Sequence, residues 1–104
     1  MQRFDVKLPA EENVLTFNMA PGLLNGNLLS GTPTVTVTTF SGNDASPTLI
    51  LNGSAQLDST QTMVLLPVKG GLDFCDYLIT VVCNTNVATV ELGLQGILPV
   101  RANP

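Results

Sequence analysis

Short segments in which apolar and polar residues alternate constrain the fold of this chain more than any other feature. Between residues 34 and 40 the sequence TVTVTTF places valine on one parity and threonine on the other. Side chains of a strand point to opposite faces in turn, so this segment predicts a strand with one buried and one exposed face. Its β-branched residues favour the same conformation.

Similar segments recur along the chain at intervals of roughly ten residues, and turns rich in Gly, Pro, Asn and Ser separate them. The expected strands cover residues 13–19, 34–40, 48–52, 55–60, 61–68, 76–84 and 87–100. We find no stretch with the apolar spacing of a helix. About seven short antiparallel strands of this kind are typical of an all-β sandwich, and a closed barrel is the alternative.

The length of the chain and its low charge indicate one domain that functions in an assembly. Its 104 residues suit a single hydrophobic core. Residues 1–12 are polar and include Pro9, so we expect an extended N-terminal arm followed by one β-sandwich domain over 13–104. Only 12% of the residues are charged, about half the usual share. A surface of Thr, Ser, Asn and Gly suits burial against other protein copies.

Both cysteines, Cys75 and Cys83, fall in or beside the strand expected at residues 76–84. Eight residues of strand span about 26 Å, whereas the Cα atoms of a disulfide lie within about 7 Å. We therefore expect two separate thiols that pack as small apolar groups. The chain has no histidine, so neither a histidine-containing zinc site nor a histidine-activated thiol is possible.

No arrangement of residues in the sequence points to catalysis or to a bound cofactor. Most acidic residues lie in turns, where aspartate commonly bonds to the backbone. The glycine motifs of nucleotide binding and the GxSxG motif are both missing. Asp73 and Asp76, close to a glycine pair, leave a calcium site as an alternative, although no DxDxDG-type loop accompanies them. We predict a protein that is not an enzyme and has no cofactor or metal.

The four basic residues are scattered: Arg3, Lys7, Lys69 and Arg101. Nucleic acids and anionic membranes are both bound through clustered positive charge, so neither partner is expected. No apolar run has the length of a transmembrane helix, and the N-terminus shows no hydrophobic signal core. Two unpaired thiols suit the reducing cytoplasm, where we expect the chain to be made.

The order of motifs resembles that of a known family. VKLPAEENV precedes an aromatic strand, LLNGNLLSG follows, and LLPVKGGLDFCDYLITVVCNT comes later. This order is similar to that of the fibre–tail adaptors, small neck and tail proteins of double-stranded DNA bacteriophages. The matching positions are Lys7, Pro9, Glu11, Phe17, Leu24, Gly26, Leu28, Leu29, Ser30, Gly70, Gly71, Tyr77, Ile79 and Thr80. The chain departs from the family at Asn27, where an acid is frequent, and by lacking the common Trp and Asp of the first strand.

The resemblance implies an immunoglobulin-like β-sandwich that is a structural component of the virion, made in the host cytoplasm. Such a protein would lie at the neck or tail, in several copies around a symmetry axis, and would anchor fibres or an adjacent ring. Its partners would be other virion proteins, namely portal, adaptor, tail, fibre or capsid proteins. A capsid decoration protein and a carbohydrate-binding module are the alternatives.

Two segments are the candidate contact sites. An extended arm can add a strand to the sheet edge of a neighbour, and its candidate residues are Arg3, Phe4, Val6, Lys7 and Leu8. The loop at 20–31 carries apolar residues that would be awkward in water on a monomer. Its candidate residues are Leu23, Leu24, Leu28 and Leu29. The alternative for this loop, that it folds back over its own core, stays open from the sequence.

Overall fold

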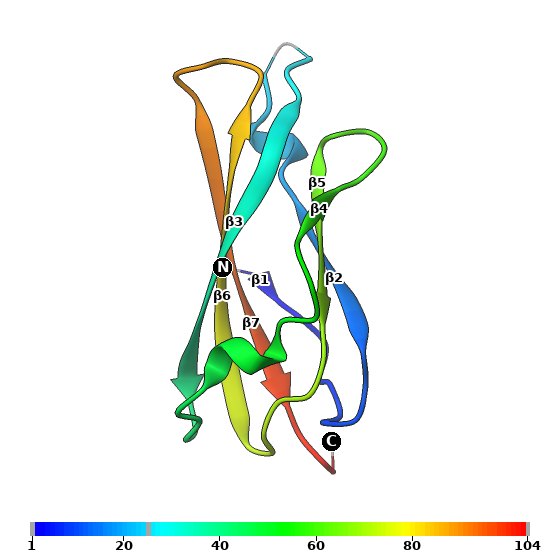
Figure 1. Cartoon of the computed structure of the whole chain (residues 1–104), viewed down its shortest axis with the longest axis vertical. Coiled ribbons are helices and arrows are strands. Elements are labelled where there is room, and N and C mark those ends of the chain that lie inside the picture. The colour runs from blue at the N-terminus through cyan, green and yellow to red at the C-terminus, as the bar shows by residue number, and fades with distance from the viewer. Residues whose placement is uncertain (1, 25, 104) are drawn as a thin grey trace.

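The computed structural model describes residues 2–24 and 26–103. Met1, Asn25 and Pro104, which belong to the expected arm, loop and domain, lie outside the described residues. Two β-sheets pack face to face in an elongated molecule with extents of 44 × 22 × 21 Å (Figure 1). The prediction of an all-β sandwich is confirmed, and the sheets do not close into a barrel.

The strands follow the order of an immunoglobulin-like sandwich. The first sheet contains, in order, β1 (Gln2–Arg3), β7 (Glu91–Val100), β6 (Cys75–Thr85) and β3 (Leu29–Ser41). The second contains β2 (Asn13–Asn18), β5 (Met63–Val68) and β4 (Gln56–Leu57). β3, β6 and β7 correspond to strands C, F and G of the immunoglobulin fold, while β2, β5 and β4 correspond to B, E and D. All neighbours are antiparallel except β1 and β7, which pair in parallel.

The prediction of a strand at residues 48–52 is wrong. Pro47–Ile50 form a short 3-10 helix, η2, and Leu51 makes only an isolated bridge to Val68. Proline has a fixed φ and no N–H, so it suits the first turn of a helix better than a strand ladder. The turn buries Ile50 and leaves Leu49 in solvent. A second short 3-10 helix, η1 (Ala20–Gly22), leads out of β2.

Strict alternation along β6 builds one half of the core. Its odd-numbered side chains are all buried between the sheets: Cys75, Tyr77, Ile79, Val81, Cys83 and Thr85. Opposite them lie Leu15 and Phe17 of β2 with Val64 and Leu66 of β5. Both cysteines are free thiols, which confirms the prediction from their spacing.

Tyr77, near the start of β6, fixes one end of the sandwich. Its hydroxyl accepts a hydrogen bond from Leu72 N–H (2.9 Å) and donates one to Asp44 Oδ2 (2.6 Å). A tyrosine at this place that bonds to the backbone a few residues upstream is the tyrosine corner of immunoglobulin-like sandwiches. Burial, assisted by the Asp44 carboxylate, raises the pKa of Tyr77. The corner joins the β5–β6 connection to the β3–η2 loop.

Candidate contact surfaces

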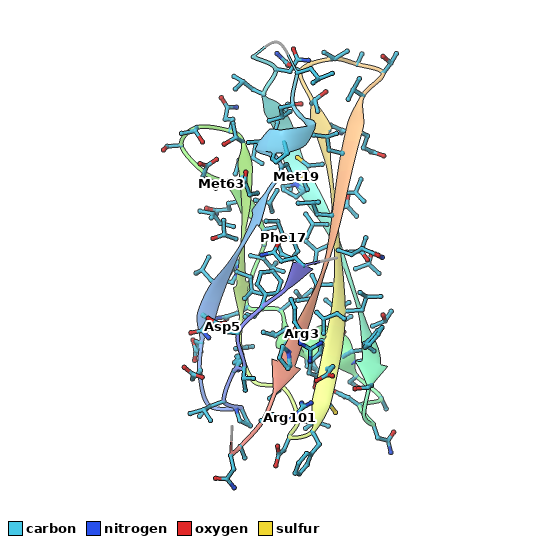
Figure 2. All side chains as sticks on the ribbon, turned by 180° about the vertical axis from the view of Figure 1, so that it is seen from behind. Arg3, Asp5, Phe17, Met19, Met63 and Arg101 are labelled. Carbon is cyan, nitrogen blue, oxygen red and sulfur yellow. The ribbon has the colours of Figure 1, made fainter. Side chains whose placement is uncertain are left out.

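The N-terminal arm lies along its own sandwich. Figure 2, a view from behind, shows β1 between β2 and β7. Gln2 pairs with Gly96 and Arg3 with Ile97. Further along, Lys7 N–H donates to the Pro99 carbonyl (3.0 Å). The backbone of the arm therefore pairs with its own chain, whereas the sequence analysis expected it to pair with a neighbour.

Phe4 anchors the arm to the core. Its half-buried ring meets Phe17 edge-on, with ring centroids 5.1 Å apart. Gly96 of β7 makes room for this ring, because a Cβ at that position would lie 2.5 Å from Phe4 Cε2. Phe4 thus contributes mainly to packing, and the part of its surface left for a partner is small.

Lys7 is buried, so its prediction as a contact residue is wrong. Only 1% of its surface is exposed. Its Nζ donates hydrogen bonds to the carbonyl oxygens of Gly70 (2.6 Å) and Leu8 (2.8 Å). Burial lowers the pKa of Lys7, and the carboxylates of Glu11 and Glu12 act in the opposite direction. The ammonium group therefore holds the arm to the β5–β6 connection inside the molecule.

The other candidates of the arm remain at the surface. Val6 and Leu8 are 45% and 37% exposed. Arg3 is exposed too, and its guanidinium lies 3.9 Å from a carboxylate oxygen of Asp76. These three side chains are available for contact with another protein.

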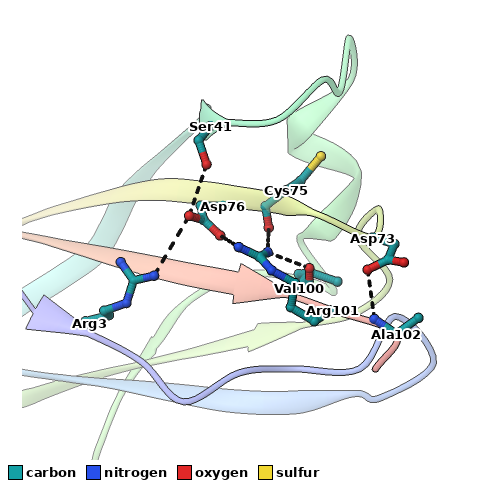
Figure 3. Close-up of polar contacts among 8 residues, drawn as sticks. All are labelled: Arg3, Ser41, Asp73, Cys75, Asp76, Val100, Arg101 and Ala102. Carbon is teal, nitrogen blue, oxygen red and sulfur yellow. Dashed lines mark hydrogen bonds and ion pairs between the residues drawn. The ribbon is translucent and has the colours of Figure 1, made fainter. Parts of the chain in front are cut away.

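Asp76 is a buried carboxylate between Arg3 and Arg101 (Figure 3). Arg101 Nη2 lies 2.8 Å from Asp76 Oδ1, and Ser41 Oγ donates to Asp76 Oδ2 at 3.0 Å. The contact with Arg101 is an ion pair outside hydrogen-bond geometry. Together with Arg3, these contacts tie both ends of the chain to β6. They are structural, and they leave this carboxylate no free oxygen for a cation.

The structure does not bring the acidic residues together as a metal site. Asp73 Oδ1, the other carboxylate considered for calcium, accepts a hydrogen bond from Ala102 N–H (Figure 3). Within residues 2–24 and 26–103, no three His, Cys, Asp or Glu side chains are grouped in a way that could hold a metal ion.

The loop at 20–31 divides its four leucines between core and solvent. Leu29 is fully buried, because it opens β3 and faces the opposite sheet, so its prediction as a contact residue is wrong. Leu23 is half-buried against the core. Leu24 and Leu28 are 67% and 37% exposed, as a contact surface would require. Each of the two interpretations of this loop therefore holds for part of it.

The segment from η1 to β3 and the β6–β7 turn lie at the same end of the molecule (Figure 1). Their exposed apolar residues are Leu24, Leu28 and Val90, and we call this group the leucine end. Asn86 joins the two loops: its N–H donates to the Leu28 carbonyl (2.9 Å), and its Oδ1 accepts from Leu28 N–H (3.2 Å). The exposed apolar side chains are thus held on a hydrogen-bonded pair of loops.

The opposite end carries a larger apolar group that the sequence analysis missed. Phe40, Leu49, Leu72 and Phe74 are each at least half exposed, and we call them the phenylalanine end. Gly42, at φ +92°, brings their loops together, because a Cβ there would lie 2.6 Å from the Phe74 carbonyl oxygen. Phe74 directly precedes β6, and its φ of +64° breaks the alternation of the strand, so the pattern of the sequence does not predict its exposure.

The comparisons with known proteins add no relative. The chain matches no protein-family model, and neither the curated proteins nor the solved structures give a match. In the part of the chain that the structure describes, no helix has the length and apolar character needed to cross a membrane. The resemblance in sequence and the two apolar ends are therefore the features that bear on function.

Proposed function

We propose that this chain is a non-enzymatic structural component of a bacteriophage virion, an adaptor at the neck or tail that anchors fibres or an adjacent ring. The observation that carries the proposal is the grouping of exposed apolar side chains at opposite ends of a sandwich 44 Å long. Exposed apolar groups of this kind mark protein contacts. Two such ends suit a spacer with a different partner at each.

The phenylalanine end has the character of a binding anchor. Phe74 is 73% exposed and its φ is +64°, in the left-handed region that costs a non-glycine residue about 1–2 kcal/mol. Its N–H is held by the Val100 carbonyl at 3.0 Å. The fold thus keeps an aromatic ring in solvent at a conformational cost, and aromatic residues are enriched in protein interfaces.

The resemblance in sequence is the basis for the assembly, the partners and the location in this proposal. Several copies around a symmetry axis, virion proteins as partners and synthesis in the host cytoplasm all follow from the likeness to fibre–tail adaptors. A decoration protein on the capsid uses the same kind of surface, so copy number distinguishes the two roles. An adaptor is present in roughly a dozen copies and a decoration protein in hundreds, as their symmetries require.

The decisive experiment is to tag the C-terminus of the chain in the phage that encodes it and to image the purified particles. Label at the neck or tail supports the adaptor, and label over the whole capsid supports the decoration protein. Quantitative mass spectrometry of the same particles gives the copy number. Particles that lack the chain would overturn the proposal, and reproducible binding on a glycan array would favour the carbohydrate-binding module.

Variants at the phenylalanine end test the mechanism. Phe40→Ser combined with Phe74→Ser removes two exposed rings and should reduce incorporation into particles roughly tenfold or more. Val14→Ser is the control, because Val14 is 60% exposed on β2 and belongs to neither apolar group. Equal incorporation of both variants would show that the end is not the contact.

A further inference from the structure

The first sheet ends in a long strand with one free edge. β3 has 13 residues, and within the described residues its only partner is β6. In Figure 1 it crosses in front of β6 and β7. The other edges are short or covered: β1 and β4 have 2 residues each, and the arm lies beside β2, where the Gln2 amide donates to the Thr16 carbonyl (3.5 Å).

The hydrogen-bond pattern shows which backbone groups face the free edge. Asn86 N–H donates to the Leu28 carbonyl, so the even-numbered residues of β6 direct their backbone groups towards β3. Their partners in β3 include Thr34, Thr36 and Thr38. Because successive residues of an antiparallel strand direct these groups to opposite sides, Val35 and Val37 present theirs to the free edge.

The edge of β3 lacks most of the usual protection. Natural edge strands carry charged residues, prolines or bulges that prevent pairing with another strand. No residue of β3 is charged. Pro33 and the two register shifts, at 30–34 and 39–41, flank the segment 34–39 but do not interrupt it. Six residues of regular strand therefore have no strand partner on this side among the described residues.

We propose that two copies of this chain pair antiparallel through these edges and form a dimer with a two-fold axis at Thr36. Val35 of one copy then lies opposite Val37 of the other, and their N–H and C=O groups bond to one another. The sheets of the two copies, with four strands each, join into one. Val35, which is half-buried in the single chain, is covered by a valine of the second copy.

The charge distribution favours a second copy as the occupant. A two-fold axis places like residues close together, so charges beside it would repel. The outward side chains of β6 next to this segment are Leu78, Thr80 and Val82, which are uncharged like β3 itself. The arm of a neighbour is not available as the added strand, because each arm pairs with its own β7. This dimer goes beyond the proposed function and does not depend on a virion.

Sedimentation velocity of the purified chain, from low to high micromolar concentration, tests the proposal. The wild type should pass from monomer to dimer. Thr36→Lys places two lysines directly opposite each other across the axis, with Cβ atoms about 5 Å apart, and should raise the dissociation constant roughly tenfold or more. Raising the salt concentration to about 1 M should recover part of the loss, because salt screens the repulsion.

Thr80→Lys is the matched control. Thr80 lies beside Thr36 on the same face, one strand further from the axis. Its two charges would stand about 14 Å apart, three strand spacings, which exceeds the Debye length of about 8 Å at physiological salt. This variant should dimerise like the wild type, and circular dichroism should show that both variants are folded.

Hydrogen exchange supplies a second measurement. The amides of Val35 and Val37 should exchange more slowly as the concentration of the wild type rises, and those of Thr36→Lys should not change. A wild type that stays monomeric at the highest concentration, with fast exchange at both valines, would overturn the proposal. The edge would then be open to a strand from a different protein. Dimerisation of Thr36→Lys as tight as that of the wild type would overturn it too.

Discussion

The two long sides of the sandwich are closed in different ways. Between β7 and β2 the arm fills the gap with the Phe4 ring and with main-chain pairing. On the side of β3 and β4, no strand of the described residues is added; η2 contacts β3, and the tyrosine corner holds the loops at the phenylalanine end. The difference teaches that an added strand can stabilise one side while the other side keeps its edge for binding. We therefore expect substitutions on the arm side to cost the most stability.

Phe4→Ala should show the largest effect. Loss of the ring leaves a gap beside Phe17 and should lower the free energy of unfolding by about 3 kcal/mol. Phe74→Ala is the control, because that ring is largely in solvent and its loss should change stability by about 0.5 kcal/mol or less. Urea denaturation measures both values. Equal losses would mean that the arm does not seal its side of the sandwich.

Gly96→Ala should have the next largest effect, near 2 kcal/mol, because the added methyl group collides with the Phe4 ring. The loss should shrink when Phe4→Ala is already present, since the colliding atoms are gone. A double-mutant cycle by urea denaturation measures this coupling. Additive losses would place the cause outside the contact between Gly96 and Phe4.

Tyr77→Phe tests the polar support at the end of the open side. The variant leaves the Leu72 N–H without its acceptor and should cost about 1–2 kcal/mol near neutral pH. The pKa of Tyr77 is raised in the folded state. Its contribution is therefore complete below the unfolded pKa of about 10 and is lost as pH rises above that value. Urea denaturation between about pH 8 and pH 11 should show a decline that the variant lacks.

Asp58→Asn should give the smallest effect, one that is present near neutral pH and disappears in acid. In the β4–β5 turn its carboxylate accepts hydrogen bonds from Thr60 Oγ1 and from the N–H groups of Thr62 and Met63. These bonds, that from Thr60 first, lower the pKa of Asp58. The stabilisation is present above the unfolded pKa of about 4 and is lost as pH falls through the folded pKa. Melting temperatures should fall less on acidification in the variant than in the wild type.

The fold was predictable where alternation is regular. β3 packs one parity against the opposite sheet, so Val35 and Val37 could be placed on the inner face from the pattern alone. The segment at 48–52 failed because Pro47 begins a 3-10 turn, in which TLI no longer alternates between two faces. β1 could not be foreseen, since a pair of polar residues carries no strand signal.

The contact residues were less predictable, because burial depends on tertiary neighbours. Lys7 is inside only because the carbonyls of Leu8 and Gly70 surround its ammonium group. Leu28 and Leu29 look alike in the sequence, yet the start of β3 sends one outward and the other inward. Phe74 could not be placed either, because its positive φ interrupts the alternation just before β6.

The two cysteines give each end of the molecule its own chemical reporter. Cys75 lies near the phenylalanine end and Cys83 near the leucine end of the same strand, and both are at most 2% exposed. Burial raises the pKa of the Cys83 thiol, so less of the reactive thiolate is present at a given pH. An alkylating reagent therefore labels each cysteine only when its own end opens. A protein bound at one end would slow labelling of the nearer sulfur and leave the distant one unchanged.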